Sequence, residues 1–389
     1  MFILKKDIFP FLAFFLITIG NGTYINYIFG DKVELIGLVL LTLLCIFTYN
    51  KRKKGILIYL KITFLSILLS LGCYLQVARI NVFFMVFSTS LIIMTIIYTS
   101  DYLIDSNRRI KLLYKSLLYG IIFTIVIGAM TGTLGLSFDS KDSIFGIIFL
   151  AGFQVKNYCG GLWMLLIILH YIYCNNTGKK NSKKNFYVQF LLFVLLILSG
   201  SKAAILLSVF FLILNNNINM TFLKKNRFSI LIISIFILIL GIYLYKNVLS
   251  NVDTYVFRMK GLQKLFEIMK DDSNRFWFGF SDIAYADTGL GYTYNMRNFL
   301  GWEASVEMAY VNILIKNGIV GMIVYLYVYL NLFKTINRNQ NNIILIALFL
   351  VVIISGFVET YIVSIHYVIG PILYCILKGL INYNYELSK

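Results

Sequence analysis

Windows of about 20 mostly apolar residues, the length a helix needs to cross the hydrocarbon core of a membrane, recur along this chain from end to end. Of the 389 residues, 59% are hydrophobic and only 13% are charged, which is too apolar for a soluble globular domain. We therefore predict an all-α polytopic membrane protein, a single integral membrane domain over residues 1–389. About 12 transmembrane helices are expected, at 8–29, 33–49, 55–75, 80–99, 112–134, 158–174, 186–199, 202–215, 228–245, 309–333, 342–357 and 362–381.

Basic clusters alternate with these predicted spans, and the positive-inside rule places them, with both chain termini, in the cytoplasm. The predicted inner segments and adjoining helix ends hold 22 Lys/Arg against 4 Asp/Glu, whereas the outer ones hold 13 of each sign. The whole net charge of +18 thus lies on the predicted inner side. Membrane topology explains the charge, so nucleic acid is not an expected partner.

One short apolar run, 186–214, has basic flanks at both ends, so the chain is expected to enter the membrane there and return. The turn "SGSK" would then stop inside the membrane, where irregular backbone needs protein or water around it. Lys202 would face an outward-facing aqueous cavity, beside Ser201, and both suit an anion such as phosphate. The alternative is a lysine that snorkels outward from an ordinary helix end.

The residues 246–308 form the only large loop that the pattern predicts, and they are expected to lie outside the cytoplasm, between the ninth and tenth spans. The loop begins with an expected amphipathic helix and continues with aromatic residues, Trp277 among them, that could stack on sugar rings or anchor at the lipid interface. Arg258, Arg275 and Arg297 are candidates for binding phosphate. Solvated surface charge is the alternative for each of them.

Several of these residues carry a family resemblance. "SGSKAA" resembles the Ser-Arg-Gly/Ala turn of the O-antigen polymerase and O-antigen ligase superfamily, with Lys202 in place of the arginine. "KNYCGG" resembles its Pro-Asn helix start, with Asn157 matching and Lys156 replacing the proline. Arg258 followed by "FWFGFS" resembles its arginine-led helix and glycine element.

The C-terminal part of the resemblance lies in "EMAYVNILIKNGIVG", where Tyr310, Gly318 and Gly321 keep their places. Glu307 stands at the family's acidic or His position, and Met308 replaces its asparagine. Glu359 in "FVETY" resembles a late acidic residue at an outer helix end. The resemblance covers roughly residues 145–365 and implies a GT-C-like fold.

The resemblance implies a glycosyltransferase that polymerises undecaprenyl-diphosphate-linked oligosaccharide repeat units into capsule or O-antigen. Glu307 would be the general base, with Glu303, one turn away, as its rival. Implied diphosphate ligands are Lys202, Ser201, Arg258, Arg275, Arg297 and, in a secondary role, Lys316. Implied sugar or lipid contacts are Asn157, Trp277, Tyr310 and Glu359. The inverting transfer would need no metal and no cofactor, because cationic side chains would stabilise the departing diphosphate.

Such an enzyme would lie in the cytoplasmic (inner) membrane, with its active site facing the periplasm or cell exterior. Its partners would be the lipid-linked oligosaccharide and the bilayer, with a chain-length regulator and a flippase as further candidates. A ligase that transfers the glycan to another acceptor stays open. So does a lipid-linked saccharide transporter or flippase, although the sequence lacks the matched pair of interrupted helices typical of transporters with inverted repeats.

Overall fold

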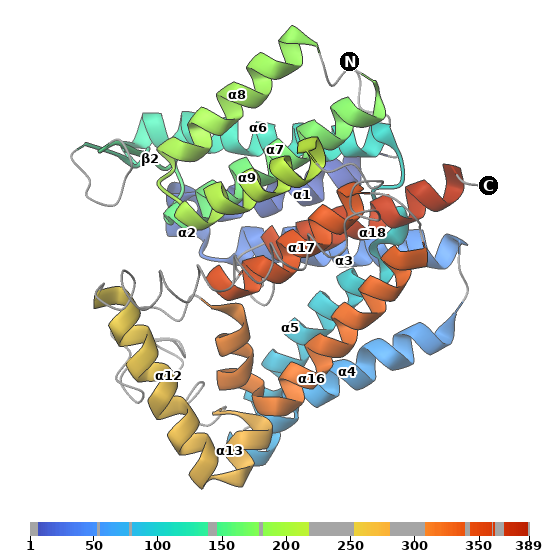
Figure 1. Ribbon diagram of the computed structural model, residues 1–389, viewed down its shortest axis with the longest axis vertical. Helices are drawn as coiled ribbons and strands as arrows, with labels where there is room; N and C mark the ends of the chain where they lie inside the picture. Colours follow the sequence, from blue (N-terminus) through green and yellow to red (C-terminus); the bar gives the residue numbers. More distant parts are fainter. Residues whose placement is uncertain are drawn as a thin grey trace. The chain divides into compact units, whose positions relative to one another are not determined.

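The computed structural model describes residues 7–52, 55–77, 80–138, 146–178, 182–217, 253–280, 308–338, 343–359, 361 and 369–387. They divide into two compact units, which we describe separately. Unit 1 comprises Met1–Thr63, Leu91–Leu212 and Thr335–Lys389, and unit 2 comprises Phe64–Ser90 and Ile213–Lys334. Helices dominate both units, and a two-stranded antiparallel pair, β1 (Leu136–Ser137) and β2 (Ile148–Phe149), lies in unit 1. Figure 1 traces these elements along the chain.

Unit 1 contains the helices α1 (Ile8–Gly20), α2 (Thr23–Phe29), α3 (Lys32–Arg52), η2 (Ser100–Tyr102), α6 (Asn107–Thr131), α7 (Lys156–Asn176), α8 (Lys183–Leu198), α17 (Ile343–Val358) and α18 (Ile369–Leu387), with most of α9 (Lys202–Asn217). Unit 2 contains α12 (Asp253–Asp271), α13 (Ser273–Phe278) and most of α16 (Ala309–Arg338). The helices α4 (Ile56–Val77) and α5 (Ile80–Thr99) each have residues in both units.

The described helices have the lengths and composition of membrane spans. Five of them are long and apolar enough to cross a bilayer, namely Lys32–Arg52, Phe83–Tyr102, Asn107–Thr131, Lys156–Asn176 and Ala309–Ile336. Shorter apolar helices accompany them, as at Ile343–Val358. The prediction of an all-α membrane protein is therefore confirmed at this level. The number of spans, their orientation and the single-domain organisation stay predictions, and the predicted span 228–245 lies outside the described residues.

The first predicted span, 8–29, is wrong as a single helix, because the chain forms α1 and α2 with a break at Asn21 and Gly22. Gly22 is extended (φ −64°, ψ 134°), and Thr23 donates its N–H to the carbonyl of Gly152 at 2.7 Å. The acceptor of this hydrogen bond, Gly152, lies far along the chain from Thr23. An apolar window does not reveal it, since Asn and Gly lower helix propensity without forcing a break.

Close helix contacts in unit 1 depend on glycine. A Cβ atom on Gly20 would lie 2.6 Å from the backbone nitrogen of Glu34, and one on Gly37 would lie 2.7 Å from that of Ile17. The antiparallel neighbours α1 and α3 can therefore pack with their backbones almost touching. The helix α7 packs against α6, α8 and α18, and its interior position leaves most of its residues buried.

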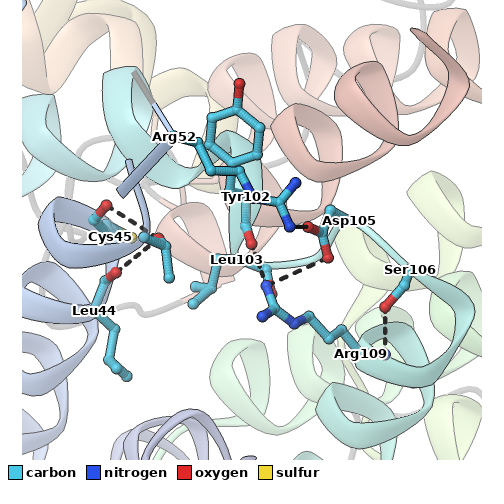
Figure 2. Close-up of polar contacts among 9 residues, drawn as sticks. Leu44, Cys45, Arg52, Tyr102, Leu103, Asp105, Ser106 and Arg109 are labelled. Carbon is cyan, nitrogen blue, oxygen red and sulfur yellow. Dashed lines mark hydrogen bonds and ion pairs between the residues drawn. The ribbon is translucent and has the colours of Figure 1, made fainter. Parts of the chain in front are cut away.

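Ion pairs gather at the C-terminal end of α3 (Figure 2). Asp105 accepts from Arg52 at 3.1 Å and from Arg109 at 3.3 Å, and Arg109 also donates to the carbonyl of Tyr102. Lys378 of α18 pairs with Asp101 at 2.7 Å. A further pair joins Asp7 to Arg108. These carboxylates are buried, and each has a basic partner.

In unit 2 a non-helical glycine interrupts α16. Gly318 has φ 58° and ψ −153°, and Gly279, just after α13, has φ 81° and ψ −153°. Only glycine adopts this region at little cost. A Cβ on either residue would lie 2.6 Å from a backbone atom of the other segment, and Phe280 donates its N–H to the carbonyl of Ile315 at 2.7 Å. Two segments that carry the family resemblance thus meet backbone to backbone.

Candidate functional site

The turn that carries Lys202 joins two short helices and lies against the start of α7. The expected reversal falls where the sequence predicts it, since α8 ends at Leu198 and α9 begins at Lys202. Gly200 has φ +72°, a conformation that a glycine adopts without strain. A Cβ on Gly160 of α7 would overlap the side chain of Ser201. Glycine at both positions therefore lets the turn approach α7 closely.

Two helix N-termini meet at this contact. The first intrahelical bonds are donated by the N–H of Cys159 in α7 and of Ile205 in α9, so the N–H groups before them have no partner within their own helices. Each N-terminus carries a partial positive charge and favours an anion. Lys202 is exposed and Lys156 is half-buried, and both stand in these first turns. The two helix N-termini and the two lysines therefore give this turn a positive electrostatic potential.

The hydroxyl of Ser201 has no hydrogen bond to any described residue, although the side chain is fully buried. Ser201 occupies the N-cap position of α9, where a serine usually accepts a bond from the following turn. Ser199, by contrast, donates to the carbonyl of Leu196 at 2.6 Å and accepts from the N–H of Ser201. An unsatisfied buried hydroxyl beside two helix N-termini is a candidate donor to a bound anion.

Tyr361 contacts the start of α7 at Asn157. The hydroxyl of Tyr361 donates to the backbone carbonyl of Asn157 at 2.7 Å, and its ring would meet a Cβ on Gly161. Glu359 is 5% exposed and lies two residues before Tyr361. The N-terminal part of α7 therefore collects three of the predicted residues, Asn157, Ser201 and Lys202. We call this set, with Lys156, the α7 cluster.

Other predicted residues belong to unit 2 and are described by themselves. Asp272 caps α13 by accepting from the N–H groups of Asn274 and Arg275, and it also accepts from the Nε of Arg275 at 3.0 Å. The guanidinium of Arg275 lies 5.1 Å from the ring centre of Phe280. These contacts hold the short helix α13 in place, so a structural role accounts for Arg275 within unit 2.

Two aromatic candidates of unit 2 differ in exposure. Trp277 is 46% exposed and packs edge-on against Phe276, which leaves much of its surface for lipid or ligand. Tyr310 is half-buried and lies edge-on to Tyr329, with ring centres 6.5 Å apart, so it belongs to the packing of α16. Lys316, also half-buried, stands two residues before the Gly318 interruption.

Glu307, the expected general base, lies outside the described residues. Glu303 and Arg297 also lie outside them. Arg258 lies within the expected helix, since α12 spans Asp253–Asp271. Along this helix Leu265 and Met269 are buried, whereas the neighbouring apolar residue Phe266 is 56% exposed. No group of three His, Cys, Asp or Glu residues that could hold a metal occurs in the part of the chain that is described. A metal-independent reaction stays a prediction.

Sequence reasoning missed two buried residues of unit 1, Tyr361 and Glu34. Tyr361 orients the start of α7 from a segment about 200 positions away, and its partner is a backbone carbonyl that no motif marks. Glu34 of α3 is 1% exposed, although "DKVE" has the composition of a loop. The sequence did offer one signal for the α7 contact, because "CGG" places two glycines where another backbone can approach.

The fold and the site together define an all-α protein with the helices of a membrane-embedded chain and a cationic turn within its larger unit. Compared with known proteins, the chain matches no family model and no curated protein sequence. The resemblance to O-antigen polymerases and ligases therefore depends on the motif residues and on where they lie.

Proposed function

We propose that the protein is a glycosyltransferase that polymerises undecaprenyl-diphosphate-linked oligosaccharide repeat units, and that the α7 cluster binds the diphosphate. One observation carries the proposal: the N-termini of α7 and α9 meet at a glycine–serine contact that also holds Lys202 and the unsatisfied hydroxyl of Ser201. A diphosphate attached to a long lipid needs a cationic site within apolar surroundings. Apolar helices supply those surroundings here.

The reaction assigned to this site is a direct displacement at the anomeric carbon. A sugar hydroxyl of the acceptor attacks, a general base takes its proton, and the diphosphate leaves with the bonding electron pair. Lys202, Ser201 and the helix N-termini would stabilise the charge that develops on the leaving group. By the resemblance, Glu307 is the base and Glu303 its rival. The protein would act at the outer face of the cytoplasmic membrane.

Removing the charge of Lys202 tests the proposal. Purified Lys202→Ala should lose most of its polymerisation of a defined undecaprenyl-diphosphate repeat, because a charge-assisted hydrogen bond to the leaving group is gone. Lys202→Arg should retain activity, because it restores the charge and the donors. Lys183→Ala is the matched control, an exposed lysine in the first turn of the neighbouring helix α8. Polymer of wild-type yield from Lys202→Ala would contradict the proposed role.

A second candidate function is transport of a lipid-linked saccharide, and a specific observation now favours it. The sequence had counted against a transporter, but the chain has interruptions at Asn21–Gly22 and at Gly318, one in each unit. Interrupted helices supply the substrate and ion sites of many transporters. Deleting the gene separates the two functions: cells that lack a polymerase still display single repeats, whereas cells that lack the flippase display none.

A further inference from the structure

Glu34, in the first turn of α3, is a buried acid without a basic partner among the described residues. Its side chain is 1% exposed, and neither carboxyl oxygen forms a hydrogen bond to a described residue. The buried acids Asp7, Asp101 and Asp105 are each paired with Lys or Arg. No described basic side chain pairs with Glu34. Its closest basic neighbour in sequence, Lys32, is exposed.

The surroundings of Glu34 are tightly packed. The backbone of Gly20, at the end of α1, comes so near that a Cβ there would lie 2.6 Å from the nitrogen of Glu34 and 2.8 Å from its Cα. Asn21 follows at the break between α1 and α2, and its side-chain nitrogen is also buried without a hydrogen bond to a described residue. Tyr158 of α7 is 2% exposed and donates its hydroxyl to the carbonyl of Ile17 at 3.1 Å.

The elements around this position supply acids, tyrosines and two lysines, Lys32 and Lys156, neither of which is paired with Glu34. The helix α1 brings no titratable side chain, α2 brings tyrosines, and the start of α7 brings Lys156, Tyr158 and Cys159. Asp31 precedes α3 and accepts from Asn26 at 3.0 Å. The acid of η2, Asp101, is bound to Lys378. The last carbonyls of α1 add partial negative charge. The side-chain amide of Asn21 is the nearby group that would favour an ionised carboxylate at position 34, and no described basic side chain pairs with that carboxylate.

An unpaired carboxylate in an apolar interior is so unfavourable that such a group takes up a proton instead. A proton needs no room beyond that left by the close packing of Gly20 against the backbone of Glu34, and a bound cation is an outcome that the labelling test distinguishes. We propose that Glu34 is a proton-binding site, in which the buried carboxyl holds its proton while the α1–α2 break is closed and releases it to water when the break opens. The proposal does not depend on the proposed glycosyltransferase activity.

The chain would open at the break between α1 and α2. Two contacts hold it, namely the N–H of Thr23 on the carbonyl of Gly152 and the bridge between Gly22 and Phe153. Losing them would expose Asn21, whose amide can donate to the newly formed carboxylate. In this step the O–H bond of the carboxyl breaks and water accepts the proton. Proton occupancy at Glu34 is therefore linked to the state of the break.

Labelling with dicyclohexylcarbodiimide tests the proposal, because this apolar reagent reacts with protonated carboxyls. The purified full-length protein would be labelled in detergent across a pH series, and the modified peptides identified by mass spectrometry. We expect label on Glu34 near neutral pH, decreasing as the pH rises. Asp101 and Asp105 are internal controls that should stay unlabelled because each is paired with a basic side chain. Glu34→Gln should remove the label, and Glu34→Asp should retain it.

Each other outcome would overturn the proposal. An unlabelled Glu34 near neutral pH, with label appearing only as the pH is lowered, would show that the carboxyl is ionised in the folded protein near neutral pH. Protection by sodium chloride but not by choline chloride at fixed pH would show that a cation occupies the position. Equal labelling of Asp101 and Asp105 would show that the reagent reports on access alone. The pH series on the wild-type protein decides the question even if Glu34→Gln fails to fold.

Discussion

The two ends of α3 handle buried acidic groups in opposite ways. At its C-terminal end, Arg52 and Arg109 pair with Asp105 (Figure 2). Lys378 pairs with Asp101 nearby. At its N-terminal end, Glu34 has neither a cation nor a hydrogen bond among the described residues. About 27 Å of helix separates Glu34 from Arg52 at the usual rise per residue. A buried charge needs compensation, so one end fixes the structure by ion pairs and the other depends on a neutral carboxyl.

The largest effect should come from breaking a pair at the charged end. Lys378→Met should destabilise the protein by about 3–5 kcal/mol, because it leaves Asp101 buried and uncompensated. The midpoint of thermal unfolding in detergent measures the loss. The double variant Lys378→Met with Asp101→Asn should recover much of it, since no charge is then buried. A single variant as stable as wild type would show that Asp101 does not need its partner.

An intermediate effect should come from the packing at the neutral end. Gly20→Ala should cost about 1–3 kcal/mol, because its Cβ would press against the backbone of Glu34 and force α1 away from α3. Gly55→Ala is the matched control, with nothing within 4 Å of an added Cβ. Equal unfolding midpoints for the two variants would contradict the close approach of α1 and α3.

The smallest effect should come from Glu34 itself. Glu34→Gln should change the free energy of unfolding by less than about 1 kcal/mol at neutral pH, because an amide replaces a neutral carboxyl of the same shape and no hydrogen bond is lost. Thermal unfolding beside Lys378→Met gives the comparison. A loss as large as that of Lys378→Met would mean that both ends of α3 bury an ionised acid, and the contrast would disappear.

Much of the fold could be predicted because a membrane span requires a long apolar segment, which is visible in the local sequence. Apolar length gave the helices α5 and α7 to within a few residues, and the basic flanks of 186–214 gave the turn at Lys202. What could not be predicted depends on distant partners. The break after α1 needs Gly152, and the orientation of Asn157 needs Tyr361. Within an apolar window, neither partner leaves a local pattern.

The candidate site was predictable in part for the same reason. Lys202 stood out because a charge inside an apolar run is costly, and a single sequence is enough to show it. Glu34 did not stand out, since it follows Asp31 and Lys32 and has the neighbours of an exposed residue. Its burial arises from the close packing of Gly20, which is a property of the folded chain.

The contact between Gly279 and Gly318 can be used to search for distantly related chains. Neither backbone leaves room for a side chain on the other, so no compensating substitution elsewhere can replace either glycine cheaply. A search pattern would contain these two glycines, each followed by an apolar residue, with a segment of variable length between them. Such a pattern should persist after overall sequence similarity is lost. Genomic neighbours of chains that keep the pattern would then reveal which surface polymer or cargo accompanies them.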